Sequence, residues 1–155
     1  MTIEIEVLEA YRALVDSDLL EQAVRCVLAA ERAEGDVTVM ITDDATVADL
    51  NQQFLGKEGP TDVLSFPAMD DDSDFVLPAA AVEAPYLGDI IIALPFTQRQ
   101  AGRLGRPLQD ELALLVVHGA LHLLGYDHAT PEEKAEMWDR QNAILHGLGI
   151  PPLEA

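Results

Sequence analysis

Hydrophobic and polar residues alternate over several short stretches of the chain, and this period of two is typical of β-strands. Near the start, Ile3, Ile5 and Val7 alternate with glutamates, which predicts a half-exposed strand over residues 2–8. Three further strands are predicted, over residues 37–41, 63–66 and 86–94. The last of them contains the unbroken apolar run Ile90–Ala93, which favours a strand buried on both faces of a sheet.

Apolar residues recur at helical spacing over most of the remaining chain, between capping residues or prolines at the start and glycines at the end. The predicted helices run from 16–18 to 32, from 42–44 to 56, from 95 to a link over 105–107, from that link to 125, and from 130 to 149. Residues 68–85 are acidic and rich in alanine, and we expect a long surface loop there. The order predicts one α+β domain over residues 1–155, a mixed sheet of about four strands with helices packed on it.

Composition narrows the environment in which we expect the protein to work. The single cysteine, Cys26, excludes an internal disulfide and fits a reducing cytosol. The N-terminus has no basic segment followed by an apolar run, and no stretch has the length that a membrane span requires. These features predict a cytoplasmic protein without a membrane partner. The net charge of −19, with an acidic run at Asp70, Asp71, Asp72 and Asp74, disfavours long-range attraction of nucleic acid.

Three of the four histidines lie within eleven residues, His118 to His128. His118 and His122 are four residues apart in an apolar helix, so their imidazoles share one face. Gly125 is a natural helix stop, after which the chain can bring His128 back toward the other two. A lone histidine on such a helix is usually a core residue, but three converging imidazoles predict a zinc site that leaves the fourth ligand position open. His146 lies outside this cluster.

The spacing of the histidines is similar to the metzincin protease signature H-E-x-x-H-x-x-G-x-x-H. Gly119 occupies the position at which those proteases carry glutamate, their general base. The metzincin-like helix therefore favours a metal site and argues against an ordinary zinc protease.

Two long segments of the chain resemble the YbeY family of bacterial rRNA maturation factors. One is H-G-A-L-H-L-L-G-Y-D-H over 118–128, and the other is P-T-D-V-L-S-F-P over 60–67. Gly88-Asp89-Ile90 is similar to a third, shorter element. The resemblance implies a metal-dependent, single-strand-specific endoribonuclease of the cytoplasm that acts in 16S rRNA 3′-end maturation and ribosome quality control. Its partners would be rRNA and the small ribosomal subunit, and its metal ligands would be His118, His122 and His128.

The chain departs from the family at one position. The family often carries an arginine directly after the aromatic residue at position 54, whereas Phe54 is followed here by Leu55. Lys57 is the nearest basic side chain, and it can hold a phosphate as a point charge without the bidentate fork of arginine.

Further residues near these motifs are candidates for catalysis or binding. Asp127 is the candidate for a carboxylate beside the metal, or else a turn residue. Ser65 and Thr61 are candidate phosphate donors or ordinary strand-end residues, and Asp62 is expected to cap or bridge structure. The arginines of the preceding segment either track the RNA backbone or form a solvated helix face. They are Arg99, Arg103 and Arg106.

Several alternatives stay open. Met137 either packs beneath the metal, as the Met-turn does in metzincins, or is a plain core residue. Imidazole ligands suit zinc, but also nickel, copper and iron. The protein is alternatively a metallohydrolase of peptides or small substrates, or a ribosome-associated binding protein whose metal is structural.

Overall fold

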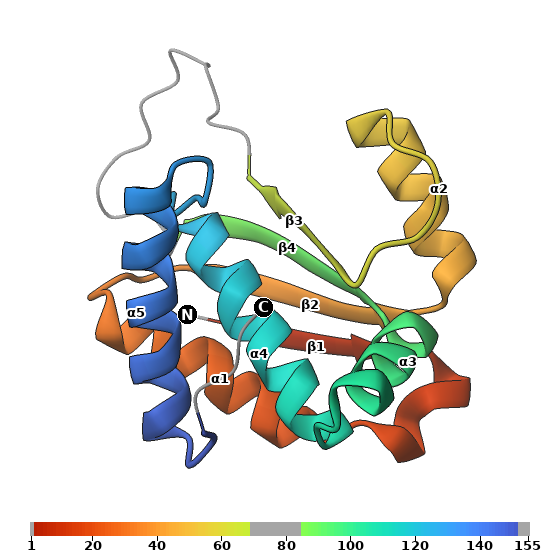
Figure 1. The fold of residues 1–155 in the computed structure, drawn as a ribbon, viewed down its shortest axis with the longest axis horizontal. Helices are drawn as coiled ribbons and strands as arrows, with labels where there is room; N and C mark the ends of the chain where they lie inside the picture. Colours follow the sequence, from red (N-terminus) through yellow and green to blue (C-terminus); the bar gives the residue numbers. More distant parts are fainter. Residues whose placement is uncertain (1, 69–84, 152–155) are drawn as a thin grey trace.

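The molecule is built around a four-stranded mixed sheet, which a computed structural model describes together with its helices over residues 2–68 and 85–151 (Figure 1). Its strands are β1 (Ile3–Val7), β2 (Asp36–Thr42), β3 (Val63–Pro67) and β4 (Tyr86–Ala93). The order across the sheet is β1-β2-β4-β3. β2 pairs in parallel with both β1 and β4, and β3 pairs antiparallel with β4. Most of the expected loop over 68–85, including the acidic run, lies outside the described residues.

The helices follow the predicted order. They are α1 (Ser17–Ala30), α2 (Asp44–Leu55), α3 (Leu94–Leu104), α4 (Leu108–Leu123) and α5 (Pro131–Gly147). Side-chain caps fix three of the starts: Asp16 accepts from the N–H of Leu19, Asp43 from that of Thr46 and Thr130 from that of Glu133. Each cap satisfies a backbone donor that the first turn of a helix leaves without a partner.

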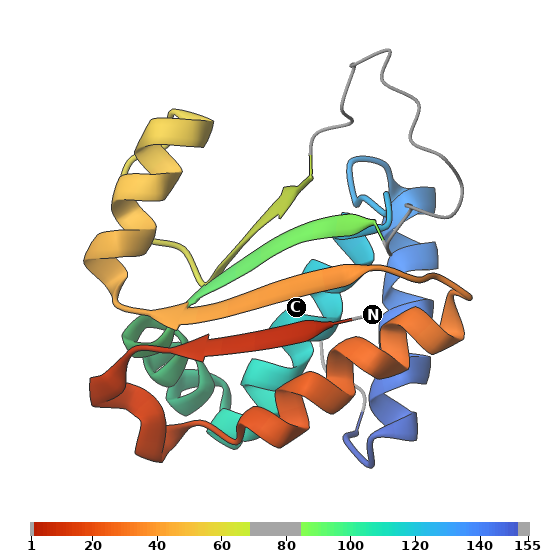
Figure 2. The ribbon, with the colours of Figure 1, turned by 180° about the vertical axis from the view of Figure 1, so that it is seen from behind.

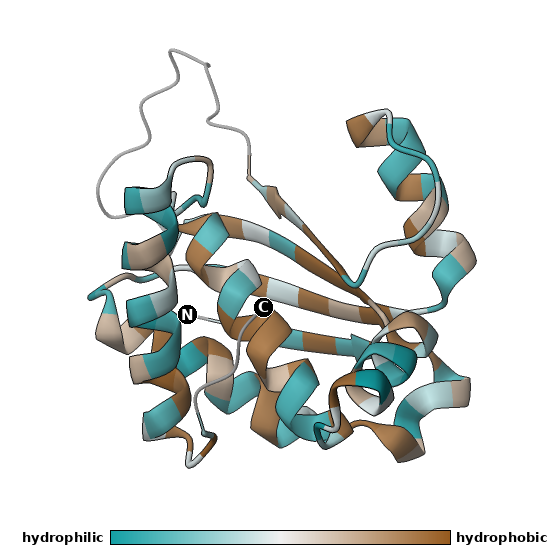
Figure 3. Cartoon of the chain, in the orientation of Figure 1, coloured by the Kyte–Doolittle hydropathy of each residue, from teal (hydrophilic) through white to brown (hydrophobic). Residues whose placement is uncertain are grey.

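The sheet has two unequal faces. One packs against α1 and α4, which α5 contacts in turn, around a large core that includes Val39 and Ile90 and contains most of the buried apolar residues. The other face carries α2 and a smaller cluster with Leu64 and Ile91, against which Phe96 of α3 also packs. Figure 2 shows the same layers from behind, and Figure 3 shows hydrophobic positions gathered along the inner strands and α4. Neighbouring residues of β4 serve both clusters, which confirms the strand buried on both faces.

The predicted α+β architecture is confirmed, including the mixed four-stranded sheet. One element was not predicted, a short 3-10 helix η1 (Glu9–Leu14) between β1 and α1. It has no buried residue, so it leaves no hydrophobic pattern in the sequence. Among the helices of residues 2–68 and 85–151, none is long and apolar enough to cross a membrane.

Candidate metal centre

The helix α4 carries two of the histidines at its C-terminal end, where it leaves the core. Most of its residues from Glu111 onward are buried, and the His118 side chain is 9% exposed while His122 is half-buried. The Nε2 atoms of His118 and His122 lie 3.1 Å apart, as their i, i+4 spacing allows.

A tight turn after α4 brings the third histidine back. Gly125 has a φ of 101°, a backbone conformation that glycine adopts without steric cost. The N–H of Gly125 donates to the His122 carbonyl and the N–H of Tyr126 donates to the Leu121 carbonyl, the two bonds of a Schellman motif. One ligand atom from each of His118, His122 and His128 then lies within 4.8 Å of the others. The convergence of the three imidazoles in the structure agrees with the sequence prediction.

Two of the rings are oriented by acceptors for their second nitrogens. Nδ1 of His118 lies 3.0 Å from the Gln141 Oε1, and Nδ1 of His122 lies 2.8 Å from the Tyr126 carbonyl oxygen. Because both partners are acceptors, each Nδ1 carries the proton and each Nε2 presents a lone pair. Two lone pairs only 3.1 Å apart repel each other unless a cation lies between them. Two imidazoles on one tetrahedral zinc ion place their nitrogens roughly 3.3 Å apart, so the donor set fits such an ion.

Burial keeps these imidazoles in the form that binds metal. Loss of solvation lowers the pKa of His118 to about 4, with the neighbouring His122 as the second cause. Burial also lowers the pKa of His122. Both rings are therefore neutral at pH 7, and the formation of a metal complex there needs no deprotonation.

A cleft of about 760 Å³ opens beside the three histidines, and we call it the histidine cleft. Its lining includes the histidines together with Leu55, Lys57, Thr61, Asp62, Ser65 and Asp127. Residues of β3, one of the two edge strands of the sheet, also line the cleft. Three imidazoles beside an open space have the form of a site with a free ligand position.

Other predicted residues at this cleft are held by specific hydrogen bonds. Ser65 Oγ donates to the Gly119 carbonyl oxygen at 3.3 Å, which ties β3 to α4. Asp127 Oδ1 accepts from the N–H of His128 at 2.7 Å, so it caps the turn and also lines the cleft. Asp62 accepts from the N–H of Val63 and from Gln100, which is the bridging role expected of it. Thr61 donates to Asp62 over 3.3 Å.

The three arginines do not join this group. Arg99 pairs with Asp44 at 2.7 Å, and Arg106 pairs with the buried Glu111 at 3.1 Å. Arg103 is exposed in the last turn of α3. The lining of the histidine cleft contains none of them, and their contact with RNA stays a prediction.

Helix α5 supplies residues at the site that the sequence did not single out. Gln141 is fully buried against His118, and the ring of Trp138 meets those of His118 and His128 edge to face. Lys134 lies one turn before Trp138 and borders a second cavity, of about 350 Å³. We call it the α5 cavity, and its lining includes Asp62, Leu115, His118, His128, Lys134 and Trp138. In the sequence, Gln141 stands four residues after Met137 and four before Leu145, and this polar residue at core spacing was the available signal.

Met137 and His146 lie at ordinary positions on α5, away from the cleft lining. Met137 is fully buried in the main core, in agreement with the interpretation as a core residue. His146 is exposed in the last turn of α5 and takes no part in the histidine cluster.

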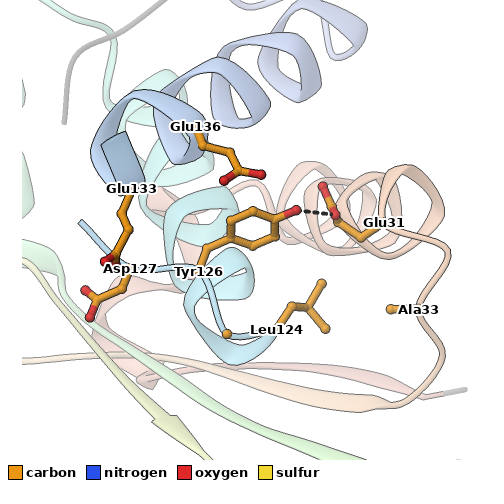
Figure 4. A pocket seen from close by; sticks show the side chains of 8 residues that line it. Glu31, Ala33, Leu124, Tyr126, Asp127, Glu133 and Glu136 are labelled. Atoms are coloured by element: carbon orange, nitrogen blue, oxygen red, sulfur yellow. Dashed lines mark hydrogen bonds between the residues drawn. The ribbon is translucent and has the colours of Figure 1, made fainter. Parts of the chain in front are cut away.

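A further pocket lies behind the turn that carries His128, and its walls anchor that turn (Figure 4). Tyr126 reaches across to α1, where its hydroxyl donates to Glu31 Oε2 at 2.8 Å. Arg140 pairs with the same glutamate at 3.2 Å and lies over the Tyr126 ring, 5.5 Å from its centroid. Burial and the bond to Glu31 raise the pKa of Tyr126, so the phenol stays protonated as a donor.

Known proteins are similar to this chain over most of its length. The family model described as Endoribonuclease YbeY matches residues 4–149. The chain is 49% identical to the Endoribonuclease YbeY of Roseiflexus sp. (strain RS-1), over 96% of this chain and 94% of that protein. It is 40% identical to the protein of that name from Brevibacillus brevis, over 96% and 98% of the two chains. The solution structure of TM1509 from Thermotoga maritima is also similar, with a TM-score of 0.61 and 29% sequence identity. The similar region includes 94% of this chain and 88% of the TM1509 chain.

Proposed function

Because the chain belongs to the YbeY family of endoribonucleases, we propose that it is a metal-dependent, single-strand-specific endoribonuclease that hydrolyses phosphodiester bonds of rRNA. We place its action at the 3′ end of 16S rRNA, on the small ribosomal subunit in the cytoplasm, and in ribosome quality control. Curated relatives of 40–49% identity that carry the name endoribonuclease support the activity. The likeness of residues 60–67 and 118–128 to the family motifs supports the rRNA substrate.

The observation that carries the proposal is the pair of facing Nε2 lone pairs of His118 and His122, 3.1 Å apart beside an open cleft. We propose zinc as the ion that they hold together with His128. Bound by these imidazoles, the ion would supply Lewis-acid chemistry toward a phosphoryl oxygen and would lower the pKa of a water toward about 7. A closed structural zinc site has four protein ligands, so an open cleft beside three imidazoles favours catalysis over a purely structural role.

The residues around the cleft have distinct proposed tasks. Lys57 would neutralise a non-bridging oxygen of the scissile phosphate as a point charge. Asp127, which the N–H of His128 fixes beside a metal ligand, would accept a proton from the attacking water. Ser65 would donate to a phosphate oxygen in exchange for its long bond to the Gly119 carbonyl.

A protease is disfavoured by the packing at position 119. A Cβ there would lie 2.9 Å from Ile90 Cγ2 and 3.0 Å from Ser65 Oγ, so any side chain at this position has to displace both neighbours. The glutamate that serves metzincins as general base would therefore disturb the contact between α4 and the sheet.

The proposal is tested by metal analysis and cleavage assays on the purified protein. We expect about one transition-metal ion per chain and cleavage of single-stranded RNA, with duplex RNA and casein left intact. A chelator, His118→Ala, His122→Ala or His128→Ala should each lower RNA cleavage by more than about 100-fold, beyond the typical effect of losing an outer-shell residue. His146→Ala, an exposed histidine outside the cluster, is the matched control and should leave cleavage unchanged.

Two results would overturn the assignment. RNA cleavage that survives all three cluster variants would show that the activity lies elsewhere. Casein cleavage that depends on the same histidines would establish the protease instead.

A further inference from the structure

The two lysines of the chain both border the histidine site. The sequence has 28 acidic residues and 9 basic ones, and Lys57 and Lys134 are its only lysines. Lys57 lines the histidine cleft and Lys134 lines the α5 cavity. His118 and His128 line both spaces, so the metal-binding rings lie between the two. Figure 1 shows the loop after α2, which carries Lys57, and α5, which carries Lys134, on either side of α4.

Neither ammonium group forms an ion pair with a carboxylate of residues 2–68 or 85–151. Among the described residues, ion pairs involve Arg25, Arg99, Arg106 and Arg140, but neither lysine. In a chain with net charge −19, an unpaired cation beside a cleft can attract an anion that the rest of the surface repels. The two lysines are therefore the available phosphate-binding charges at this site.

Lys134 is held in place by the same ring that contacts the histidines. Its Nζ lies 5.3 Å from the centroid of the Trp138 ring, within the range of a cation–π contact. The Trp138 ring meets those of His118 and His128 edge to face, with centroids 5.5 and 5.6 Å away. One indole thus fixes the ammonium at a defined place relative to two metal-binding imidazoles, so that it is oriented before the substrate binds.

We propose that Lys134, held on Trp138, binds an RNA phosphate next to the scissile one, on the side of the histidines opposite to Lys57. The single strand then crosses the C-terminal end of α4, from the loop after α2 to the first turn of α5. This inference rests on the proposed endoribonuclease function and adds a second phosphate subsite to it.

The test compares variants that change the net charge equally but at different places. Lys134→Gln removes the proposed contact, and Lys134→Arg keeps the charge. Arg12→Gln is the matched control, because Arg12 is exposed in η1, after the strand β1 at the far edge of the sheet. The affinity of chelator-treated protein for a short single-stranded RNA is measured at several salt concentrations, and cleavage kinetics are measured with the metal-loaded protein.

For Lys134→Gln we expect roughly fivefold weaker binding, and a slope of log affinity against log salt that is shallower by about 0.7, the value for one phosphate contact on a single strand. KM should rise with little change in kcat, since the metal ligands are intact. Lys134→Arg should keep the salt slope and the KM of the wild type. The double variant Lys57→Gln, Lys134→Gln should have a salt slope that is shallower than that of the wild type by about 1.4.

The possible results distinguish a failure of the Lys134 subsite from a failure of the proposed endoribonuclease function. If the wild type cleaves RNA and Lys134→Gln matches Arg12→Gln in salt slope and KM, Lys134 only stabilises α5 through Trp138 and the subsite does not exist. If the wild type neither binds nor cleaves single-stranded RNA, the proposed function fails and the inference fails with it.

Discussion

Position 119 shows how closely α4 approaches the sheet. The methyl group of an alanine would lie 2.9 Å from Cγ2 of Ile90, a residue that is itself fully buried in β4. Ser65, which donates to the Gly119 carbonyl, would also be displaced. The glycine therefore permits the helix contact that places the histidines over the edge of the sheet.

We predict that Gly119→Ala lowers the free energy of unfolding by about 1–2 kcal/mol. Overpacking of a core costs about 1–3 kcal/mol, and the better helix propensity of alanine returns up to about 1 kcal/mol. Gly102→Ala is the control, because Gly102 lies within α3 with nothing near its Cβ position, and it should stabilise the protein. Urea denaturation measures both, and a Gly119→Ala variant as stable as Gly102→Ala would refute the close packing.

The buried imidazole of His118 makes a pH prediction for the metal-free protein. Burial lowers its pKa from 6.5 to about 4, so between these values the unfolded chain binds a proton that the folded chain does not. The contribution of this group is fully present above pH 6.5 and is lost as the pH falls toward 4, at up to about 1.4 kcal/mol per pH unit. Chelator-treated wild type and His118→Gln are compared by denaturant unfolding from pH 4.5 to 7.5. A stability difference that does not change with pH would contradict the shift.

At the scale of elements, the contact between α5 and α4 fixes the metal ligand. Gln141 is fully buried and its Oε1 accepts from His118 Nδ1 at 3.0 Å. Acceptors of this kind set the tautomer and the orientation of a ligating imidazole. The position of α5 is thus part of the site, although the helix itself carries none of the three ligands.

We predict that Gln141→Leu lowers zinc affinity by about 10–100-fold, the usual effect of losing such an acceptor. Gln141→Glu should retain most of the affinity, since a carboxylate still accepts from Nδ1. Gln109→Leu is the control: Gln109 bonds with Leu14 and Asp16 at the opposite end of α4, so it should lose stability but keep its zinc affinity. Competition with a chromophoric chelator measures all three, and unchanged affinity in Gln141→Leu would rule out the orienting role.

Individual elements could be predicted from the sequence where one face is buried. The alternation of β1, the apolar run of β4 and the stop at Gly125 each reflect a local physical constraint. Helix η1 has no buried residue and so has no such signal. The antiparallel place of β3 at the sheet edge depends on a long connection to β4, which local patterns do not specify.

The residues of the candidate site likewise fall into those that local sequence predicts and those that depend on long-range contacts. His118, His122 and His128 are close in sequence, so helix geometry and one glycine suffice to bring them together. Lys134, Trp138 and Gln141 reach the site only because α5 docks against α4, a long-range contact. The arginines of the basic segment 99–106 have helical spacing too, but only the fold shows that Arg99 pairs with Asp44 and Arg106 with Glu111.

At the scale of the whole molecule, β3 lies at one edge of the sheet, next to the histidines. The histidine cleft forms there, between the loop after α2 and the end of α4. An RNA strand that enters it must approach a protein whose net charge is −19. The same charge acts on folding, because like charges repel each other more in the compact state than in the unfolded chain.

We therefore predict opposite effects of salt on stability and on binding. Raising NaCl from about 0.01 M to 0.5 M shortens the screening length from about 30 Å to below about 8 Å, which weakens repulsion among the carboxylates and should raise the Tm by several degrees. RNA affinity should fall over the same range, because each counterion that a phosphate contact releases gains less entropy when the bulk salt concentration is higher. Thermal unfolding and RNA titration in the same buffers test the pair of effects, with an uncharged solute of equal osmolality as the control. A Tm that falls with NaCl, or that rises equally with the uncharged solute, would show that self-repulsion does not limit the stability of this fold.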